Sequence, residues 1–209
     1  MYLGMIVGAY GYAYFSPTII AQLGYASIHA NLLSTPPWAA AFVFAMSVAI
    51  FSDYLAHRFI FALTCILIAM IGFIVLLVPN LPTSVYYGSL FLAAPGAYSA
   101  MPVIVCWFNT NLGGHLKRSV GSAWQIGFGN IGGIMATYVF LPNTAPRFVL
   151  GKGFCIGFLG LAVLSTVIYF VGCTWENKRR DERVCGHSHL SEEEMNRLGD
   201  AHPDFRYIL

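Results

Sequence analysis

The feature that most constrains this chain is a series of long segments without a charged side chain. A soluble domain carries about 25% charged residues, against 10% here. Most of the charged residues of this chain lie between Glu176 and Arg206. This distribution predicts an integral membrane protein, with a lipid bilayer around its body and a solvated tail. The only charged residues before Cys173 are Asp53, Arg58, Lys117, Arg118, Arg147 and Lys152.

The lengths of the apolar segments predict how many times the chain crosses the bilayer. A helix needs roughly 20 apolar residues to cross a hydrocarbon layer about 30 Å thick. We predict an all-α membrane protein, a six-transmembrane-helix bundle over residues 1–173, and then a tail over 174–209. A capping-box pattern that starts at Ser191 predicts a short helix near 191–198 in this tail. The predicted spans lie near 2–22, 33–52, 59–79, 84–107, 119–141 and 154–173.

The basic residues outside the spans predict the orientation. Arg58, Lys117, Arg118 and the basic residues of 178–183 fall on one side of a six-span bundle, and Arg147 and Lys152 fall on the other. Lys and Arg accumulate in cytoplasmic connections. We therefore expect a multi-pass protein of the plasma membrane with both termini in the cytoplasm.

Several classes of function are not expected from this sequence. No hydrolase, zinc-protease or P-loop signature occurs, and no Asp, Glu, His, Lys or Arg lies within a predicted span. Residues 127–132 match the dinucleotide pattern GxGxxG, but they lie mid-span, where small residues favour close helix packing. The five cysteines are scattered, and the net charge is only +2. We predict no enzyme, no cofactor, no metal site and no nucleic-acid partner.

Five polar or aromatic residues within the spans are candidates for contact with a small organic solute. Tyr10 and Tyr14 are four residues apart and share a helix face, and Tyr98 is placed to meet them. Gln125 and Asn130 are five apart, about 140° around a helix, so one face cannot hold both. For each residue, packing or an interhelical hydrogen bond stays open as the alternative to lining a pathway. Asn130 is the strongest candidate.

The connections on the basic side carry candidate gating residues. Asp53 ends one span and Arg58 begins the next, which favours a salt link that holds two helices together. Lys117 and Arg118 lie in the following connection on that side. A conformational latch is the functional interpretation of these four residues, and charge that merely sets the topology is the alternative.

These segments, in this order, resemble a known family. The chain is similar to the C-terminal half of a fungal allantoate-permease-like transporter, in the anion:cation symporter family of the major facilitator superfamily. The resemblance covers essentially the whole sequence. It rests on Ser16-Pro17-Thr18-Ile19-Ile20 and on the segments 23–25, 33–37, 52–58, 114–118, 127–133, 145–148 and 202–207.

The resemblance implies a protein of two six-helix halves with the solute bound between them near the midplane. It implies transport of a small organic anion or vitamin-like solute, coupled to protons in the complete protein. The chain then corresponds to one half of a major facilitator fold, and its partner is the missing N-terminal half or a second copy. The alternative is a non-transporting or dimeric six-helix membrane protein, acting as a half-transporter, a sensor or a scaffold.

Overall fold

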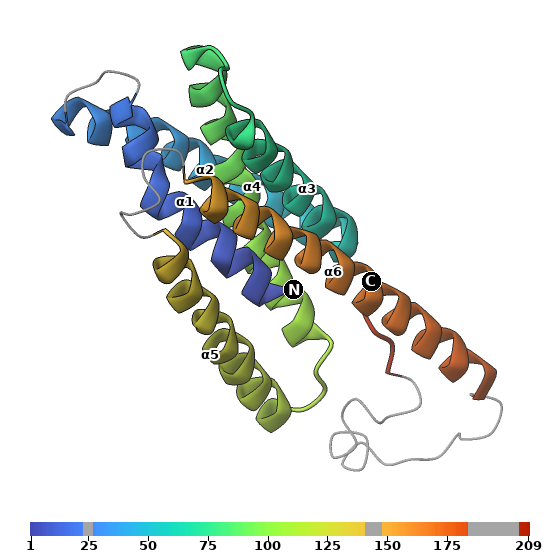
Figure 1. Cartoon of the computed structure of the whole chain (residues 1–209). Helices are drawn as coiled ribbons and strands as arrows, with labels where there is room; N and C mark the ends of the chain where they lie inside the picture. Colours follow the sequence, from blue (N-terminus) through green and yellow to red (C-terminus); the bar gives the residue numbers. More distant parts are fainter. Residues whose placement is uncertain (23–26, 141–147, 184–204) are drawn as a thin grey trace.

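In the residues that the structure describes, six helices pack into an elongated bundle (Figure 1). The computed structural model describes residues 1–22, 27–140, 148–183 and 205–209, and in these ranges all the regular secondary structure is helical. In the bilayer this follows from the backbone, because a helix satisfies its own N–H and C=O groups where no water is present. The helices are α1 (Tyr2–Gln22), α2 (Ser27–Leu55), α3 (Arg58–Leu77), α4 (Thr83–Thr110), α5 (His115–Val139) and α6 (Val149–Arg183).

Each predicted span coincides with one helix, but several helices are longer than expected. The segment 149–153, predicted to be a connection, is the start of α6, and α6 continues ten residues past the predicted end at Cys173. Its last turns project beyond the other helices in Figure 1. The short helix expected near 191–198 lies outside the described residues.

Among the described residues, four helices are long and apolar enough to cross a membrane: Leu32–Leu55 of α2, α3, α4 and Val149–Glu182 of α6. The helices α1 and α5 have 21 and 25 residues, which is also enough length for a crossing. Tyrosine, glycine and polar residues interrupt the aliphatic side chains of these two helices. These apolar helices support an integral membrane protein.

The centre of the bundle is the seam between α3 and α4, where two glycines allow the backbones to touch. A Cβ atom added to Gly72 would lie 2.6 Å from the backbone nitrogen of Ala93. One added to Gly96 would lie 2.4 Å from the backbone nitrogen of Ala69. Small residues at such positions let membrane helices approach closely. This seam fixes the position of α4, which also packs against α1 and α2.

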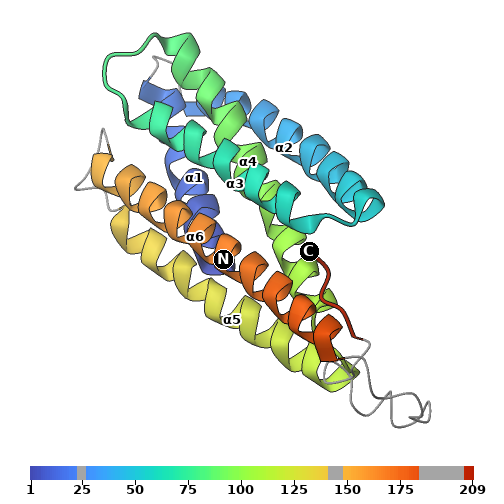
Figure 2. The ribbon, with the colours of Figure 1, turned by 90° about the vertical axis from the view of Figure 1, so that its right-hand side faces the viewer.

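The opposite edge of the bundle is α5, which packs chiefly against α1 (Figure 2). Its buried residues are all small: Gly129, Gly132, Gly133 and Ala136. The ring of Tyr2 lies over Gly129, and the ring of Tyr10 lies over Gly133. The glycine-rich segment is therefore a packing surface, as the sequence predicted.

Lys152 was expected in a connection but lies in the first turns of α6, where it is buried. Its Nζ donates a hydrogen bond to the carbonyl oxygen of Leu76, 3.0 Å away, near the end of α3. A cation is favourable at this position because the carbonyl groups at a helix C-terminus carry partial negative charge. This contact fastens α3 to α6 at one end of the bundle.

Candidate functional site

The seam between α1 and α5 carries most of the predicted solute-contact residues. Tyr10 and Tyr14 remain 41% and 46% exposed, and their ring centroids are 6.5 Å apart. The hydroxyl of Tyr14 shares a hydrogen bond of 3.1 Å with the hydroxyl of Thr137 on α5. The two tyrosines therefore present aromatic faces and hydroxyl groups at the surface where α1 meets α5.

Asn130 is exposed on α5 and extends this polar strip. It lies one turn before Gly133, against which Tyr10 packs, and two turns before Thr137. The helical repeat places these three residues on one face of α5. Tyr10, Tyr14, Asn130 and Thr137 thus form what we call the α1–α5 strip.

Gln125 lies off this strip. It is about 140° around the helix from Asn130, and its side chain is only partly exposed. Its Oε1 atom is buried and has no hydrogen-bond partner. A buried acceptor without a donor carries a desolvation penalty. Because of its position and its unpaired oxygen, Gln125 is not counted among the four strip residues.

Tyr98 meets α1 at a different place from the one predicted. Its hydroxyl donates to the carbonyl oxygen of Ala9 at 3.0 Å. Its ring lies 4.7 Å from that of Trp38 and 6.3 Å from that of Tyr12 between centroids. Tyr98 therefore belongs to an aromatic cluster that joins α1, α2 and α4, and its hydroxyl is already engaged.

Sequence reasoning missed three residues of this region. Tyr12 and Trp38 are not among the five candidates that the sequence indicated. The structure packs their rings 5.8 Å apart between centroids. Thr137 could have been found from its spacing, because it lies seven residues after Asn130 and therefore on the same helix face.

The predicted salt link is present in the connection between α2 and α3. Arg58 Nη2 lies 3.0 Å from Asp53 Oδ1, and Arg58 Nη1 donates to Thr110 Oγ1 at 3.4 Å. Arg58 is only 12% exposed whereas Asp53 is 68% exposed. Arg58 therefore links the ends of α2, α3 and α4.

Lys117 and Arg118 are exposed in the first turn of α5. A side-chain nitrogen of Arg118 reaches the carbonyl oxygen of Leu112 at 3.5 Å. Basic residues do not stabilise the N-terminal turn of a helix, where the macrodipole favours negative charge. Their position is consistent with a role in topology or gating and not in the stability of α5.

The described part of the chain offers no group of three or more His, Cys, Asp or Glu side chains suited to a metal ion. A surface hollow along α6 is lined by Trp175, Lys178, Arg179 and Glu182, and it contains none of the predicted solute residues. The α1–α5 strip supplies hydroxyl and amide groups beside aromatic rings. Such a strip can hydrogen-bond and stack against an organic molecule.

Comparison with known proteins identifies homologues among fungal membrane transporters. An uncharacterised transporter of Schizosaccharomyces pombe is 30% identical over 200 residues, 96% of this chain and 39% of its own length. The MFS-type transporter cnsO of Penicillium expansum is 30% identical over 99% of this chain and 41% of its own length. The high-affinity nicotinic acid transporter of Saccharomyces cerevisiae is 24% identical over 98% of the chain and 39% of its own length. No family model matches the chain, and no solved structure matches it.

The chain thus spans about two-fifths of the length of the curated relatives that it matches. Some of these relatives are named as major-facilitator-type transporters, and the apolar helices of this chain support an integral membrane protein.

Proposed function

We propose that this chain forms the C-terminal six-helix half of a major facilitator transporter that moves a small organic anion or vitamin-like solute. The observation that carries the proposal is the similarity to transporters, which extends over nearly the whole chain but only two-fifths of each relative. In such a protein all six helices cross the membrane, the basic ends of α3 and α6 face the cytoplasm, and the plasma membrane is the site of action. Proton coupling then depends on groups in the other half, because the apolar parts of these helices contain no carboxylate.

In this proposal the α1–α5 strip lines the solute pathway. Tyr10 and Tyr14 contribute aromatic faces, and Asn130 contributes an amide that can donate and accept hydrogen bonds. Tyr98 supports the strip by bonding to the backbone of α1 beside Tyr10. Gln125 offers its unpaired acceptor to a second donor, on the solute or on the other half.

The pathway is tested by Asn130→Ala in the complete transporter, with uptake measured at equal membrane abundance. We expect uptake to fall at least fivefold, because the amide is lost from the exposed strip. The matched control is Phe128→Ala on the same helix, which removes an exposed apolar side chain about 160° away. Equal uptake by wild type and Asn130→Ala would remove Asn130 from the site. Nicotinate is a suitable first solute, since one relative is a nicotinic acid transporter.

The gate is tested by Arg58→Asp, which reverses the charge opposite Asp53. We expect the rate of transport to fall while the apparent affinity for the solute changes little, because the connection lies apart from the α1–α5 strip. Reduced insertion with unchanged transport per inserted molecule would support the alternative that Arg58 only sets the topology.

The half-transporter assignment is tested by the size of the cellular product. A C-terminal epitope tag at the chromosomal locus and a membrane blot should show a band at about twice the 22.9 kDa of this chain or more. A single band near 22.9 kDa would favour the alternative, in which the six helices pair with a second copy or serve as a non-transporting sensor or scaffold.

A further inference from the structure

Residues 205–209 lie against the bundle at the end where α4 stops and α6 extends outward (Figure 1). We propose that this segment is an intramolecular peptide ligand and that the ends of α3, α4 and α6 form its binding site. We call residues 205–209 the docked segment. The inference concerns the assembly of the bundle itself and does not depend on which solute is carried.

Two asparagines recognise the main chain of the docked segment. Asn111 accepts from the Ile208 nitrogen at 2.8 Å and donates to the Ile208 oxygen at 3.1 Å. Asn177 accepts from the Tyr207 nitrogen and donates to the Tyr207 oxygen, both at 2.8 Å. Neighbouring residues of an extended chain direct their N–H and C=O groups to opposite sides. The docked segment is therefore held between Asn111 at the end of α4 and Asn177 on α6.

Two further contacts join other groups of the bundle to the main chain of the segment. The indole Nε1 of Trp107, a fully buried residue, donates to the Ile208 oxygen at 2.7 Å. The backbone nitrogen of Arg58, the first residue of α3, donates to the oxygen of Leu209 at 2.9 Å. A helix leaves its first N–H groups without partners inside the helix, so the segment satisfies one of them. Three helices thus bind one short peptide.

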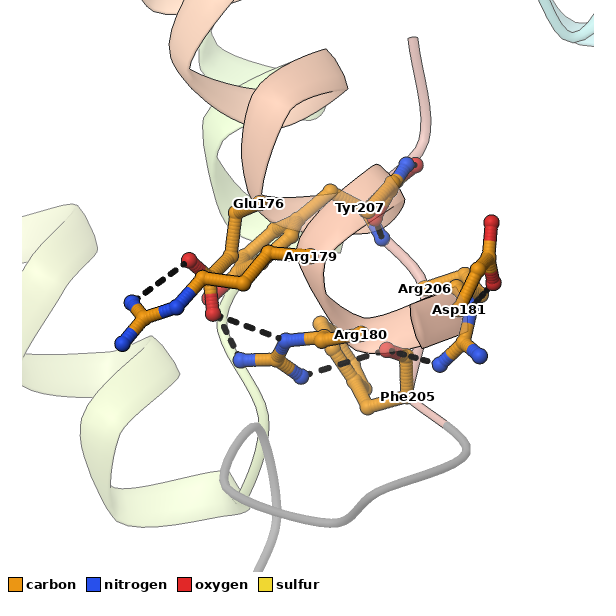
Figure 3. Close-up of polar contacts among 8 residues, drawn as sticks. Glu176, Arg179, Arg180, Asp181, Phe205, Arg206 and Tyr207 are labelled. Carbon is orange, nitrogen blue, oxygen red and sulfur yellow. Dashed lines mark hydrogen bonds and ion pairs between the residues drawn. The ribbon is translucent and has the colours of Figure 1, made fainter. Parts of the chain in front are cut away.

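Side chains add selectivity for aromatic residues (Figure 3). The guanidinium of Arg180 lies 4.9 Å from the ring centroid of Tyr207 and 5.9 Å from that of Phe205. It also donates to the carbonyl oxygen of Phe205 at 3.2 Å, and Glu176 orients it from one turn earlier on α6. Stacking of a guanidinium on aromatic rings is a recognised attraction. The ligand class is therefore an extended peptide with aromatic residues at its first and third positions.

The docked segment supplies partners to polar groups that are buried while it is in place. Asn111 is then 3% exposed, and its Oδ1 accepts from the docked segment. Removing the segment would take away these partners of the Asn111 oxygen and the Trp107 indole, which costs free energy to the extent that the two groups stay away from water. Occupancy of the site is therefore expected to stabilise the ends of α3, α4 and α6 as one unit.

The test compares the full chain, purified in detergent or lipid nanodiscs, with a variant that ends at residue 204. Hydrogen exchange should accelerate at least tenfold for the amide of Arg58, and the melting temperature should fall by several degrees. A capped peptide with the sequence of residues 205–209, added in trans, should restore both, and a scrambled peptide should not. Unchanged exchange and melting temperature in the shortened chain would overturn the proposal, and so would equal rescue by the scrambled peptide.

Point variants separate main-chain recognition from general surface contact. Asn177→Ala should release the docked segment and accelerate exchange of the Tyr207 amide at least tenfold. Asn177 is only partly buried, so this variant should still fold. The control is Asp181→Asn, which removes the 2.8 Å ion pair with Arg206 but no contact to the main chain of the segment. Equal exchange in the two variants would overturn the proposal.

Discussion

Two of the helix seams in the described residues, α3–α4 and α1–α5, both contain glycine but use it in different ways. At the α3–α4 seam, the atoms that a Cβ on Gly72 or Gly96 would meet include backbone atoms of the facing helix within 3 Å. At the α1–α5 seam, Gly129 and Gly133 face the rings of Tyr2 and Tyr10. A backbone cannot move without its whole helix, whereas a ring can change its rotamer. The first seam is therefore the more rigid. The second can adapt at Gly129 and Gly133, although a Cβ on Gly132 would lie 3.0 Å from the backbone oxygen of Leu3.

The α3–α4 and α1–α5 seams also differ in the polar groups that they carry. The adaptable seam exposes Tyr10, Tyr14 and Asn130. The residues of the rigid seam are buried and mostly apolar or small, among them Gly72, Ala93 and Gly96. In the transporter proposed above, the rigid seam would act as the frame and the α1–α5 strip as the surface that contacts the solute.

The largest effect is expected for Gly96→Ala in the rigid seam. The added methyl group would lie within 2.9 Å of the backbone of Ala69 and the oxygen of Cys65, so α3 and α4 must separate. We expect a loss of about 3 kcal/mol in unfolding free energy, as for an overpacked core. The measurement is thermal unfolding of the purified protein in detergent.

The control for this prediction lies on the same helix. Gly88→Ala adds the same methyl group where nothing lies within 4 Å. It should leave the stability unchanged or raise it slightly, because alanine is the better helix former. Equal stability of the two variants would mean that the α3–α4 seam is not rigid.

A smaller effect is expected for Gly133→Ala in the adaptable seam. The new methyl group would lie 3.1 Å from the Tyr10 ring, which can shift by a few tenths of an ångström. We expect a loss of about 1 kcal/mol, at the low end of overpacking, together with reduced uptake by the complete transporter because Tyr10 has moved. Gly127→Ala, on the same helix with nothing within 4 Å, should change neither quantity. A loss of stability as large as that of Gly96→Ala would break the comparison between the seams.

The existence and approximate position of the helices could be predicted from the sequence, but not most of their limits, because apolar runs are the direct requirement of a lipid environment and do not mark where a helix continues beyond it. The end of α6 could not be predicted, since residues 176–183 have no apolar signal. Their helix is supported instead by the ion pairs of Glu176 with Arg179 and Arg180, three and four residues later. Opposite charges at this spacing also occur in many segments that are not helical, so the spacing alone does not predict a helix.

The candidate site was predicted only in part, for a related physical reason. Periodicity gives the face on which a residue lies, so the pairing of Tyr10 with Tyr14 was correct. It does not give the partner helix, so the contact of Tyr98 with Tyr12 and Trp38 was missed. The Asp53–Arg58 ion pair was predicted because its connection is too short to separate the two side chains. No local pattern indicated that Asn111 would bind residue 208.

A still smaller effect on stability is expected for Tyr14→Phe. This variant removes one hydrogen bond of 3.1 Å between exposed groups, so we expect a loss of about 0.6 kcal/mol, as for typical bonds between membrane helices. Thr137→Val also removes the hydrogen bond that the Thr137 hydroxyl donates to the Gly133 oxygen at 2.9 Å. The double variant should still cost less than the sum of the two single variants, because both of them remove the bond between Tyr14 and Thr137. Thermal unfolding of the wild type, the two single variants and the double variant provides the double-mutant cycle. Strict additivity would show that the bond does not join α1 to α5.

The smallest effect on stability is expected for Asp53→Asn in the connection between α2 and α3. Its carboxylate is 68% exposed, so water and salt screen the attraction to Arg58, and we expect less than about 1 kcal/mol. Arg58 stays in place because it retains Thr110 and the docked segment. The measurement is thermal unfolding at low and high salt, where the difference between wild type and variant should shrink as ionic strength rises. A loss comparable to that of Gly96→Ala, insensitive to salt, would make the connection part of the rigid frame and not a surface link that can open and close.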